Sequence, residues 1–224
     1  MIKEIQTIND FISKTNLSLT GYTVLTEVGS NNYLYTPVIA AIAGAHRVYA
    51  WTKDSTFGSG SKNIEDCLEI CKISKVENVV EFSNGIRPSY QIQEADIVTN
   101  SGFIRPINKD FISSMKEDAV ISLMFESWEL REEDVDIHYC QKSGRKVAGI
   151  WENHPLLKVF SGVGPLAIKL SLEAGYEIFQ NKIIVWSDDQ FGKETVKSFD
   201  NMGACEVIMT CDSEELYDNL SGTD

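Results

Sequence analysis

The chain has 224 residues, 43% of them hydrophobic, and its 33 acidic and 20 basic residues give a net charge of −13. A field of this sign repels polyphosphate backbones, and no apolar run reaches the ~18 to 20 residues of a membrane-spanning helix, so we expect neither a nucleic-acid partner nor a membrane anchor. Five cysteines without the dense spacing of a disulfide scaffold, and an N-terminus unlike a signal peptide, predict a cytoplasmic protein.

Predicted strands and helices alternate along the chain. A helix is expected first, at Ile2 to Lys14. The six strands expected after it are Tyr22 to Glu27, Arg47 to Trp51, Val79 to Phe82, Asp96 to Thr99, Ala119 to Phe125 and Lys146 to Ile150. Further helices are expected from Thr36-Pro37, at Asn63 to Lys72 and at Asn108 to Met115. The alternation predicts a parallel sheet with helices on both faces, flavodoxin-like or Rossmann-like.

The C-terminal part repeats this pattern on a smaller scale. The elements expected there are a helix at Gly164 to Ala174, a strand at Ile183 to Val185, a helix at Lys193 to Asn201 and a strand at Glu206 to Thr210. We therefore predict an α/β protein in which residues 1–153 form a flavodoxin-like sheet domain. Residues 154–224 form a linker helix and a partial Rossmann-like βαβ segment. Because two strands leave unpaired edges and half a core, we expect a homodimer in which the C-terminal segment is buried.

The stretch KIIVWSDDQFGKE, residues 182–194, occupies the place of the dinucleotide-binding motif G-x-G-x-x-G. Its glycine positions hold Ser187, Asp189 and Gly192, and Asp212 stands where the ribose-binding acid belongs. Asp189, flanked by Asp188, adds a Cβ and a negative charge where the pyrophosphate would approach. The pattern predicts a degenerate site for NAD or NADP. The alternative is an ordinary strand–turn–helix whose acids favour the helix N-terminus.

Polar side chains follow three of the predicted strands. They are Ser30, Asn31, Asn32, Asn100, Ser101, Arg105, Glu126 and Arg131. Because the carboxyl ends of parallel strands meet at one edge of the sheet, we expect these residues to converge on a small-molecule site. Arg105 is the best candidate for a carboxylate or phosphate contact, since a guanidinium binds either one bidentately. For Glu126 and Arg131 the alternative is a solvated ion-pair turn, with Trp128 closing the edge.

His154 lies beside Glu152 at the predicted domain junction. A histidine next to a carboxylate can act as a general base, and the alternative is a hinge histidine that caps a helix. Cys67 and Cys71 lie four residues apart, on one face of a predicted helix, without further ligands at metal-binding spacing. We therefore predict buried thiols and no metal site.

The segment VLTEVGSNNYLYTPVIAAIAGAHRVYAWTKD, residues 24–54, resembles the first motifs of methyltransferases that use S-adenosylmethionine. Glu27 and Gly29 close the first strand and Asp54 follows the second, as in that family. The string EADIVTNSGF, residues 94–103, resembles the family's fourth-strand motif. The resemblance covers about half of the chain and implies S-adenosylmethionine as cofactor. Residues 30–32 depart from it, because they are Ser-Asn-Asn where the family has a glycine-rich loop.

A longer resemblance, from Tyr22 to the C-terminus, is to the D-2-hydroxyacid dehydrogenases of the formate and glycerate type. It rests on the order of the elements and on three strings: D-V-D-I-x6-G-x2-V at residues 134–147, E-N-H-P at 152–155, and KIIVWSDDQFG. It implies a flavodoxin-like domain before a Rossmann domain, with the substrate between them. The family's catalytic Arg, Glu and His follow the nucleotide motif, and the sequence reaches Asp224 before any of them, so no residue here inherits those roles.

Three functions remain open on this basis. The first is a dehydrogenase-like protein that binds a small molecule or a nucleotide, without full catalytic machinery in this chain. The second is a methyltransferase-like protein. The third is a non-catalytic structural or regulatory dimer module. Whether the chain is an enzyme stays open; if it is, the longer resemblance implies an NAD(P)-dependent oxidoreductase.

Overall fold

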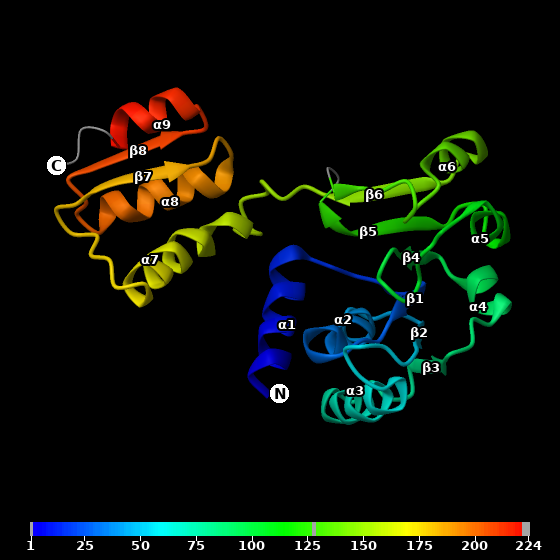
Figure 1. The fold of residues 1–224 in the computed structure, drawn as a ribbon. Coiled ribbons are helices and arrows are strands. Elements are labelled where there is room, and N and C mark those ends of the chain that lie inside the picture. Colours follow the sequence, from blue (N-terminus) through cyan, green and yellow to red (C-terminus); the bar gives the residue numbers. More distant parts are fainter. Residues whose placement is uncertain (1, 127–128, 221–224) are drawn as a thin grey trace. The chain divides into compact units, whose positions relative to one another are not determined.

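The computed structural model describes residues 2–126 and 129–220 (Figure 1). The chain forms two compact units, residues 1–151 and residues 152–224. No helix within the described residues is both long enough and apolar enough to cross a bilayer.

The first unit is built on a six-stranded sheet. Its strands are β1 (Thr23–Glu27), β2 (Arg47–Thr52), β3 (Val80–Asn84), β4 (Ile97–Thr99), β5 (Val120–Glu126) and β6 (Lys146–Ile150). They lie in the order β3-β2-β1-β4-β5-β6, and every neighbouring pair is parallel. This is the order of the dinucleotide-binding Rossmann sheet, whereas flavodoxin has the order 2-1-3-4-5. The predicted α/β class is confirmed, and of the two sheet types considered the Rossmann-like one is found.

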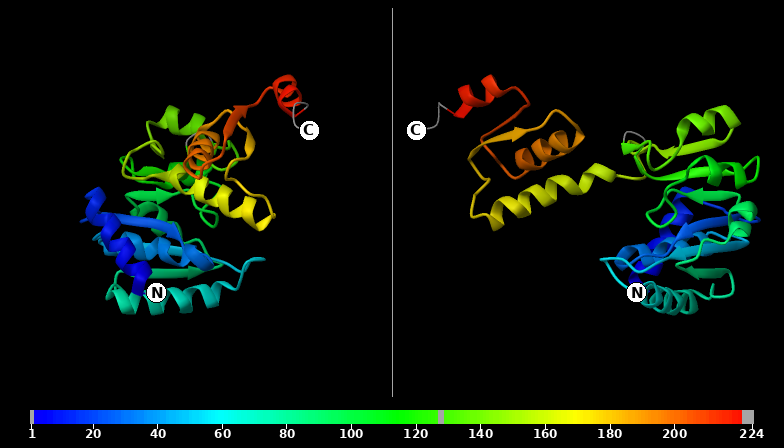
Figure 2. Two further views of the ribbon diagram at one scale, coloured as in Figure 1. Left: turned by 90° about the vertical axis from the view of Figure 1, so that its left-hand side faces the viewer. Right: turned by 45° about the vertical axis from the view of Figure 1, so that its right-hand side comes forward.

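Helices cover both faces of this sheet (Figure 1; the right-hand panel of Figure 2 gives a second view). They are α1 (Ile2–Thr15), α2 (Thr36–Ile42), α3 (Gly60–Ser74), α4 (Ser89–Glu94), α5 (Lys109–Ser114) and α6 (Ile137–Ser143). The pleat divides neighbouring strand residues between two cores, so that Val48 and Ala50 pack toward α2 and α3 while Tyr49 and Trp51 pack toward α4 and α5. All six predicted strands of this unit are present.

Two helices of the first unit were not predicted, for different reasons. The six residues of α4 are mostly polar, and the helix is held by buried Gln91, whose Oε1 accepts the indole N–H of Trp51. This tertiary contact has no counterpart in a local pattern. The signals for α6 were present: Asp136 accepts the N–H of Tyr139 as an N-cap, and Gly144 ends the helix at φ 73°.

The second unit is a smaller βαβ arrangement. After a short 3₁₀ turn, η3 (Val159–Gly162), it contains α7 (Val163–Glu173), β7 (Lys182–Trp186), α8 (Gln190–Asn201), β8 (Glu206–Thr210) and α9 (Ser213–Leu220). Strands β7 and β8 are parallel and pair over their whole length. The predicted strands and the helices α7 and α8 are found; α9 was not predicted. Few side chains of this unit are buried, chiefly Ile178 and Phe199.

Apolar side chains remain exposed on this second unit. Leu166 and Leu170 of α7 are 53% and 55% exposed, and Trp186 at the end of β7 is 54% exposed. A two-stranded sheet is marginal in water without further packing.

We therefore expect the full chain to sediment as a homodimer at micromolar concentration, with the segment from about residue 160 onward resistant to limited proteolysis. A monomer whose C-terminal segment is rapidly cleaved would contradict this expectation.

Candidate functional site

A cavity of about 830 Å³ lies where β1, β4 and β5 end. Strands β1 and β4 are neighbours in the sheet, but the chain continues from β1 to β2 on one side and from β4 to β5 on the other. The cavity therefore lies at the topological switch point, the place where open α/β sheets bind their ligands. Its volume falls in the range of small-molecule sites.

Three loops bring the predicted site residues together at this cavity. Of the eight predicted residues, seven line it: Ser30, Asn31, Asn32, Asn100, Ser101, Arg105 and Arg131. The eighth, Glu126, is the last residue of β5, but its side chain lies outside the described part of the structure, as does Trp128. The seven residues converge as expected if the carboxyl ends of parallel strands meet at one edge of the sheet. That they bind a ligand stays a prediction.

Other residues that line the cavity were not predicted as a site. They are Tyr33, Lys53, Ser55, Phe57, Gly102, Phe103, Met124, Phe125 and Glu129, together with Glu27 and Gly29, which the methyltransferase resemblance had singled out. Lys53, Ser55 and Phe57 belong to the loop that follows β2. The strand-end argument would have found this loop if it had been applied to β2 as well.

Arg105 is held in place by an ion pair. Its Nη1 lies 2.6 Å from Oδ2 of Asp134, and the two side chains are 31% and 12% exposed. One arm of the guanidinium is therefore engaged by the protein. Its Nη2 lies 3.7 Å from the position that a Cβ on Gly102 would occupy. A planar guanidinium anchored at one end presents its remaining donors in a fixed geometry, which suits a carboxylate or phosphate.

Glu27 is a buried carboxyl at the wall of the same cavity. It is the last residue of β1 and is only 6% exposed. Its Oε2 accepts the backbone N–H of Phe103 at 2.9 Å. Burial raises the pKa of this carboxyl, while the Phe103 hydrogen bond and the charge of Arg105 offset part of the rise. Groups whose pKa is shifted by burial cluster at functional sites, which makes Glu27 a candidate site residue.

Asn100 and Ser101 are the buried polar residues after β4. The Oδ1 of Asn100 accepts the backbone N–H of Met124 at 2.6 Å, and Asn100 is 1% exposed. The hydroxyl of Ser101 lies 2.8 Å from that of Thr99, which lies 2.8 Å from that of Thr26. These bonds tie the loop to the sheet, so that both residues are rigidly placed at the cavity.

The raised pKa of Glu27 predicts how stability depends on pH. Between its ordinary pKa and the raised folded value, the native state binds a proton that the unfolded state has released, so the free energy of unfolding falls as pH rises through this window. Glutamine keeps an acceptor for the Phe103 N–H and cannot ionise. We expect Glu27→Gln to be more stable than the parent above the window in urea titrations, with the difference vanishing below the ordinary pKa. Equal pH profiles of the two proteins would contradict this.

In the second unit, the predicted nucleotide turn is closed by its own side chains. Asp189 is the N-cap of α8, and its Oδ1 accepts the N–H of Gly192 at 3.1 Å and the hydroxyl of Ser187 at 2.7 Å. The Ser187 hydroxyl and, after it, the Gly192 N–H lower the pKa of Asp189. The protein thus supplies its own anion at the helix N-terminus.

Gly192 and Asp212 also have local structural roles. A Cβ on Gly192 would lie 2.5 Å from Oγ of Ser187 and 3.0 Å from Cε of Met209, so glycine is needed for α8 to lie close to the turn and to β8. This is the packing role of the third glycine in the nucleotide motif. The Oδ1 of Asp212 accepts the N–H groups of Glu214 and Glu215 at the start of α9.

The idea that Asp188 and Asp189 prevent a dinucleotide from binding at this turn can be tested. We expect no binding of NAD by the parent and weak binding by the double variant Asp188→Gly, Asp189→Gly, because the variant frees the Gly192 N–H and removes two charges. NAD should be preferred over NADP, since Asp212 opposes a 2′-phosphate. Isothermal titration calorimetry measures both affinities. Asp189→Asn, which keeps a cap but not its charge, is the control and should not bind. Tight binding by the parent would contradict the idea that the acids block the site.

Two other predicted residues are used locally. The Nδ1 of His154 accepts the backbone N–H of Leu156 at 3.2 Å, and the His154 carbonyl accepts the N–H of Leu157. These contacts close a turn rather than cap a helix, because the first helical element of the second unit begins at Val159; Glu152 lies in the same stretch, and both roles considered for His154 stay predictions. In the first unit, the carboxylate of Asp54 accepts the N–H of Gly60 at 2.8 Å and thereby supports the start of α3.

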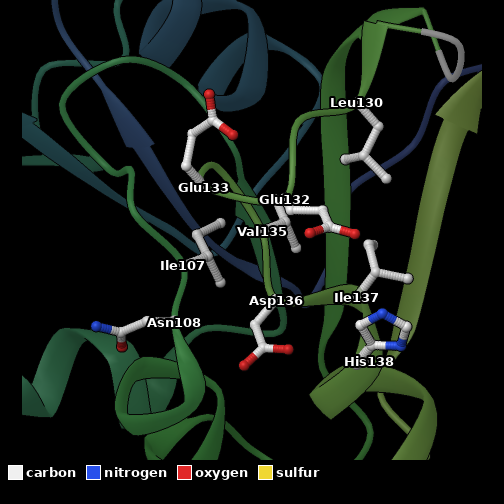
Figure 3. Close-up of a pocket in the computed structure, with 9 residues that line it drawn as sticks. All are labelled: Ile107, Asn108, Leu130, Glu132, Glu133, Val135, Asp136, Ile137 and His138. Atoms are coloured by element: carbon white, nitrogen blue, oxygen red, sulfur yellow. The ribbon is translucent and has the colours of Figure 1, made fainter.

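A second hollow, of about 590 Å³, is lined by residues 107–108 before α5 and by residues within the stretch 130–138, which runs from the segment after β5 into α6. It contains three acids and a histidine, but Figure 3 shows the side chains of Glu132, Glu133 and Asp136 pointing in different directions. The described residues contain no group of three or more His, Cys, Asp or Glu that could hold a metal ion. Cys67 and Cys71 are buried, as predicted. The cavity at the switch point is therefore the stronger candidate site.

No family model and no curated protein matches the sequence. Among solved structures, a dipicolinate synthase chain from Bacillus halodurans matches 91% of this chain and 67% of its own, with 12% identity and a TM-score of 0.56. A dipicolinate synthase chain from Bacillus subtilis matches 92% and 66%, with 14% identity and a TM-score of 0.52. A shikimate 5-dehydrogenase from Listeria monocytogenes, solved with shikimate and NAD, matches 62% of this chain and 49% of its own, with 12% identity and a TM-score of 0.43.

The chain thus spans about two thirds of the length of the two dipicolinate synthase chains. At these identities the two likenesses show the fold alone. They agree with the strand order in placing the chain among proteins with a Rossmann-like fold. The narrower assignment to the D-2-hydroxyacid dehydrogenases stays a prediction.

Proposed function

We propose that this chain is a dehydrogenase-like protein that binds a small oxyanion, a carboxylate or a phosphate, in the cavity at the switch point. The observation that supports this most is the convergence of Lys53, Arg105 and Arg131 on one cavity. The chain carries a net charge of −13, whereas at this cavity three cations balance the nearby acids Glu27, Glu129 and Asp134. The cavity is therefore less negative than the molecule as a whole, which favours an anionic ligand there over other parts of the surface.

The acids offset part of the positive charge at the cavity, since Asp134 pairs with Arg105. Glu27 and Glu129 are the acidic residues among its described lining, and burial disfavours the charged form of Glu27 by raising its pKa. Arg105 is anchored through Asp134, so little side-chain entropy is lost when its remaining donors meet a ligand. Together these features favour a small anion over a cation or a neutral apolar ligand.

Binding is proposed rather than turnover. Because Asp189 caps the nucleotide turn of β7 and α8, NAD or NADP would compete with the protein's own carboxylate there. The methyltransferase alternative is less well supported, because two of its motif residues have local structural roles. The carboxylate of Asp54 accepts the N–H of Gly60. Gly29 is needed for packing, since a Cβ there would lie 2.9 Å from Cβ of Tyr33. A cytoplasmic homodimer is part of the same proposal, and a dimer module without a ligand is the alternative.

Gly102 offers a direct test of this proposal. A methyl group there would lie 3.4 Å from Oε2 of Glu27 and 3.7 Å from Nη2 of Arg105, which are ordinary contact distances. Gly102→Ala should therefore fold normally while filling the space between the two side chains. We expect lactate, glycerate or sulfate to raise the melting temperature of the parent, and Gly102→Ala to weaken this binding by about tenfold or more.

Two matched controls accompany this test. Gly162→Ala places a methyl group where no atom lies within 4 Å and should bind like the parent. Arg131→Gln should weaken binding, whereas Arg47→Gln, the same change at the amino end of β2, should not. NAD, NADP and S-adenosylmethionine complete the thermal-shift panel. Stabilisation by one of these three but by none of the small acids would contradict the proposal, and stabilisation by nothing would favour the dimer module.

A further inference from the structure

The loop that carries Arg105 is held by a second arginine from outside the cavity. Arg87 lies between β3 and α4 and is not among the described residues that line the cavity. Its Nη2 donates to the carbonyl of Phe103 at 2.7 Å and to the carbonyl of Arg105 at 2.9 Å. Arg87 therefore connects the segment after β3 to the loop after β4, although β2 and β1 lie between these two strands in the sheet.

The guanidinium of Arg87 is itself supported by Trp51 of β2. Its Cζ lies 5.7 Å from the centre of the Trp51 ring, within the range of a cation–π contact. The ring is 1% exposed, and its indole N–H is donated to buried Gln91 of α4. Arg87 thus rests on a fixed part of the core, and its two hydrogen bonds to the loop are charge-assisted.

The loop is bonded on both sides of the peptide units that Arg87 contacts. The N–H of Phe103 is donated to Oε2 of Glu27 at 2.9 Å, so that both polar backbone groups of Phe103 are bonded to charged side chains. The N–H of Arg105 is donated to the carbonyl of Ser101 at 3.1 Å, and its side chain pairs with Asp134. Among these partners, Arg87 is the one that holds the carbonyls of both residues.

We propose that Arg87 is a positioning residue for the anion site: it fixes the backbone of Phe103 and Arg105 and thereby the place of the Arg105 guanidinium at the cavity. This inference rests on the proposed function and adds a residue outside the cavity on which affinity depends. Without Arg87 the two carbonyls turn to water, and the loop gains conformations in which the guanidinium is displaced. An anion must then order the loop as it binds, which lowers its affinity.

Arg145 provides a matched control. Its Nη1 donates to the carbonyl of Glu117 at 3.1 Å and its Nη2 to the carbonyl of Met115 at 3.2 Å, so it too ties a segment down by two carbonyls. These residues lie just before β5 and β6, at the opposite end of the parallel strands from the cavity. Arg87→Gln and Arg145→Gln therefore remove the same charge and the same kind of hydrogen bonds, but only the first does so at the loop of Arg105.

Isothermal titration calorimetry with lactate and sulfate measures binding to the full chain, at a temperature at which the parent and both variants are folded. We expect Arg87→Gln to bind about three- to tenfold more weakly than the parent, which is the effect of having to order one long side chain on binding. Arg145→Gln should bind like the parent. The ratio of the parent's affinity to that of Arg87→Gln should persist in about 0.5 M potassium chloride, where the Debye length is roughly 4 Å, because screening does not restore a displaced loop.

Hydrogen exchange of the ligand-free proteins tests the loop itself. In Arg87→Gln the amides of Phe103 and Arg105 should exchange faster relative to those of β1, because the loop opens locally more often. In Arg145→Gln this ratio should equal that of the parent. The measurement needs no ligand, so it examines the positioning of the loop separately from binding.

The outcomes separate this inference from the proposed function. Parent-like affinity of Arg87→Gln, or unchanged exchange of both amides, overturns the inference and leaves the anion site intact. A loss of affinity that disappears at high salt would show that Arg87 acts through its charge, and an equal loss in Arg145→Gln would show an effect of stability; either result overturns the inference. If neither probe binds the parent, the proposed function fails, and the role of Arg87 in binding fails with it.

Discussion

The parallel pairing of β1 with β4 is the constraint on which the first unit depends. The two strands are joined in register at Val24–Ile97 and Leu25–Val98, and the Asp96 carboxylate accepts the N–H of Thr23 at 2.7 Å just before β4 begins. We call this β1–β4 pair the seam. From it the chain runs from β1 to β2 on one side and from β4 to β5 on the other. Because right-handed crossovers in opposite directions place their helices on opposite faces, the loops diverge at the seam and leave the cavity between them.

The seam is polar where it meets the cavity. The hydroxyls of Thr26 and Thr99 bond across the two strands, and Ser101 continues the chain of hydroxyls to the cavity wall. Each such bond contributes only about 0.5 to 1.5 kcal/mol, but together they determine where the loop after β4 leaves the sheet. The path of this loop brings Oδ1 of Asn100 to the N–H of Met124 and the N–H of Phe103 to Oε2 of Glu27. The positions of the donors thus follow from the pairing of two strands rather than from the loop sequence.

The parts of this arrangement that sequence could predict are those that depend on local pattern. Every strand was found because each is a short apolar run, and seven of the eight expected residues meet at one cavity because strand ends converge in any parallel sheet. The strand order could not be read in the same way. It depends on which side of β1 each crossover packs, and Asn100 illustrates the limit: its position after a strand is visible in the sequence, but the unsatisfied Nδ2 follows only from the Met124 N–H, which is 24 residues further along the chain.

The turn between β7 and α8 and the end of β4 differ in whether their hydrogen-bond donors already have acceptors. At the turn between β7 and α8, the Gly192 N–H that a pyrophosphate would use is already given to Asp189, and the carboxylate is supported by Ser187. At the end of β4, the corresponding donor, Nδ2 of Asn100, is buried and has no acceptor in the described structure. Most buried donors in folded proteins have a hydrogen-bond partner. The turn is complete by itself, whereas the first unit brings Lys53, Arg105 and Arg131 together at one cavity, and for this reason we place the proposed anion in the first unit.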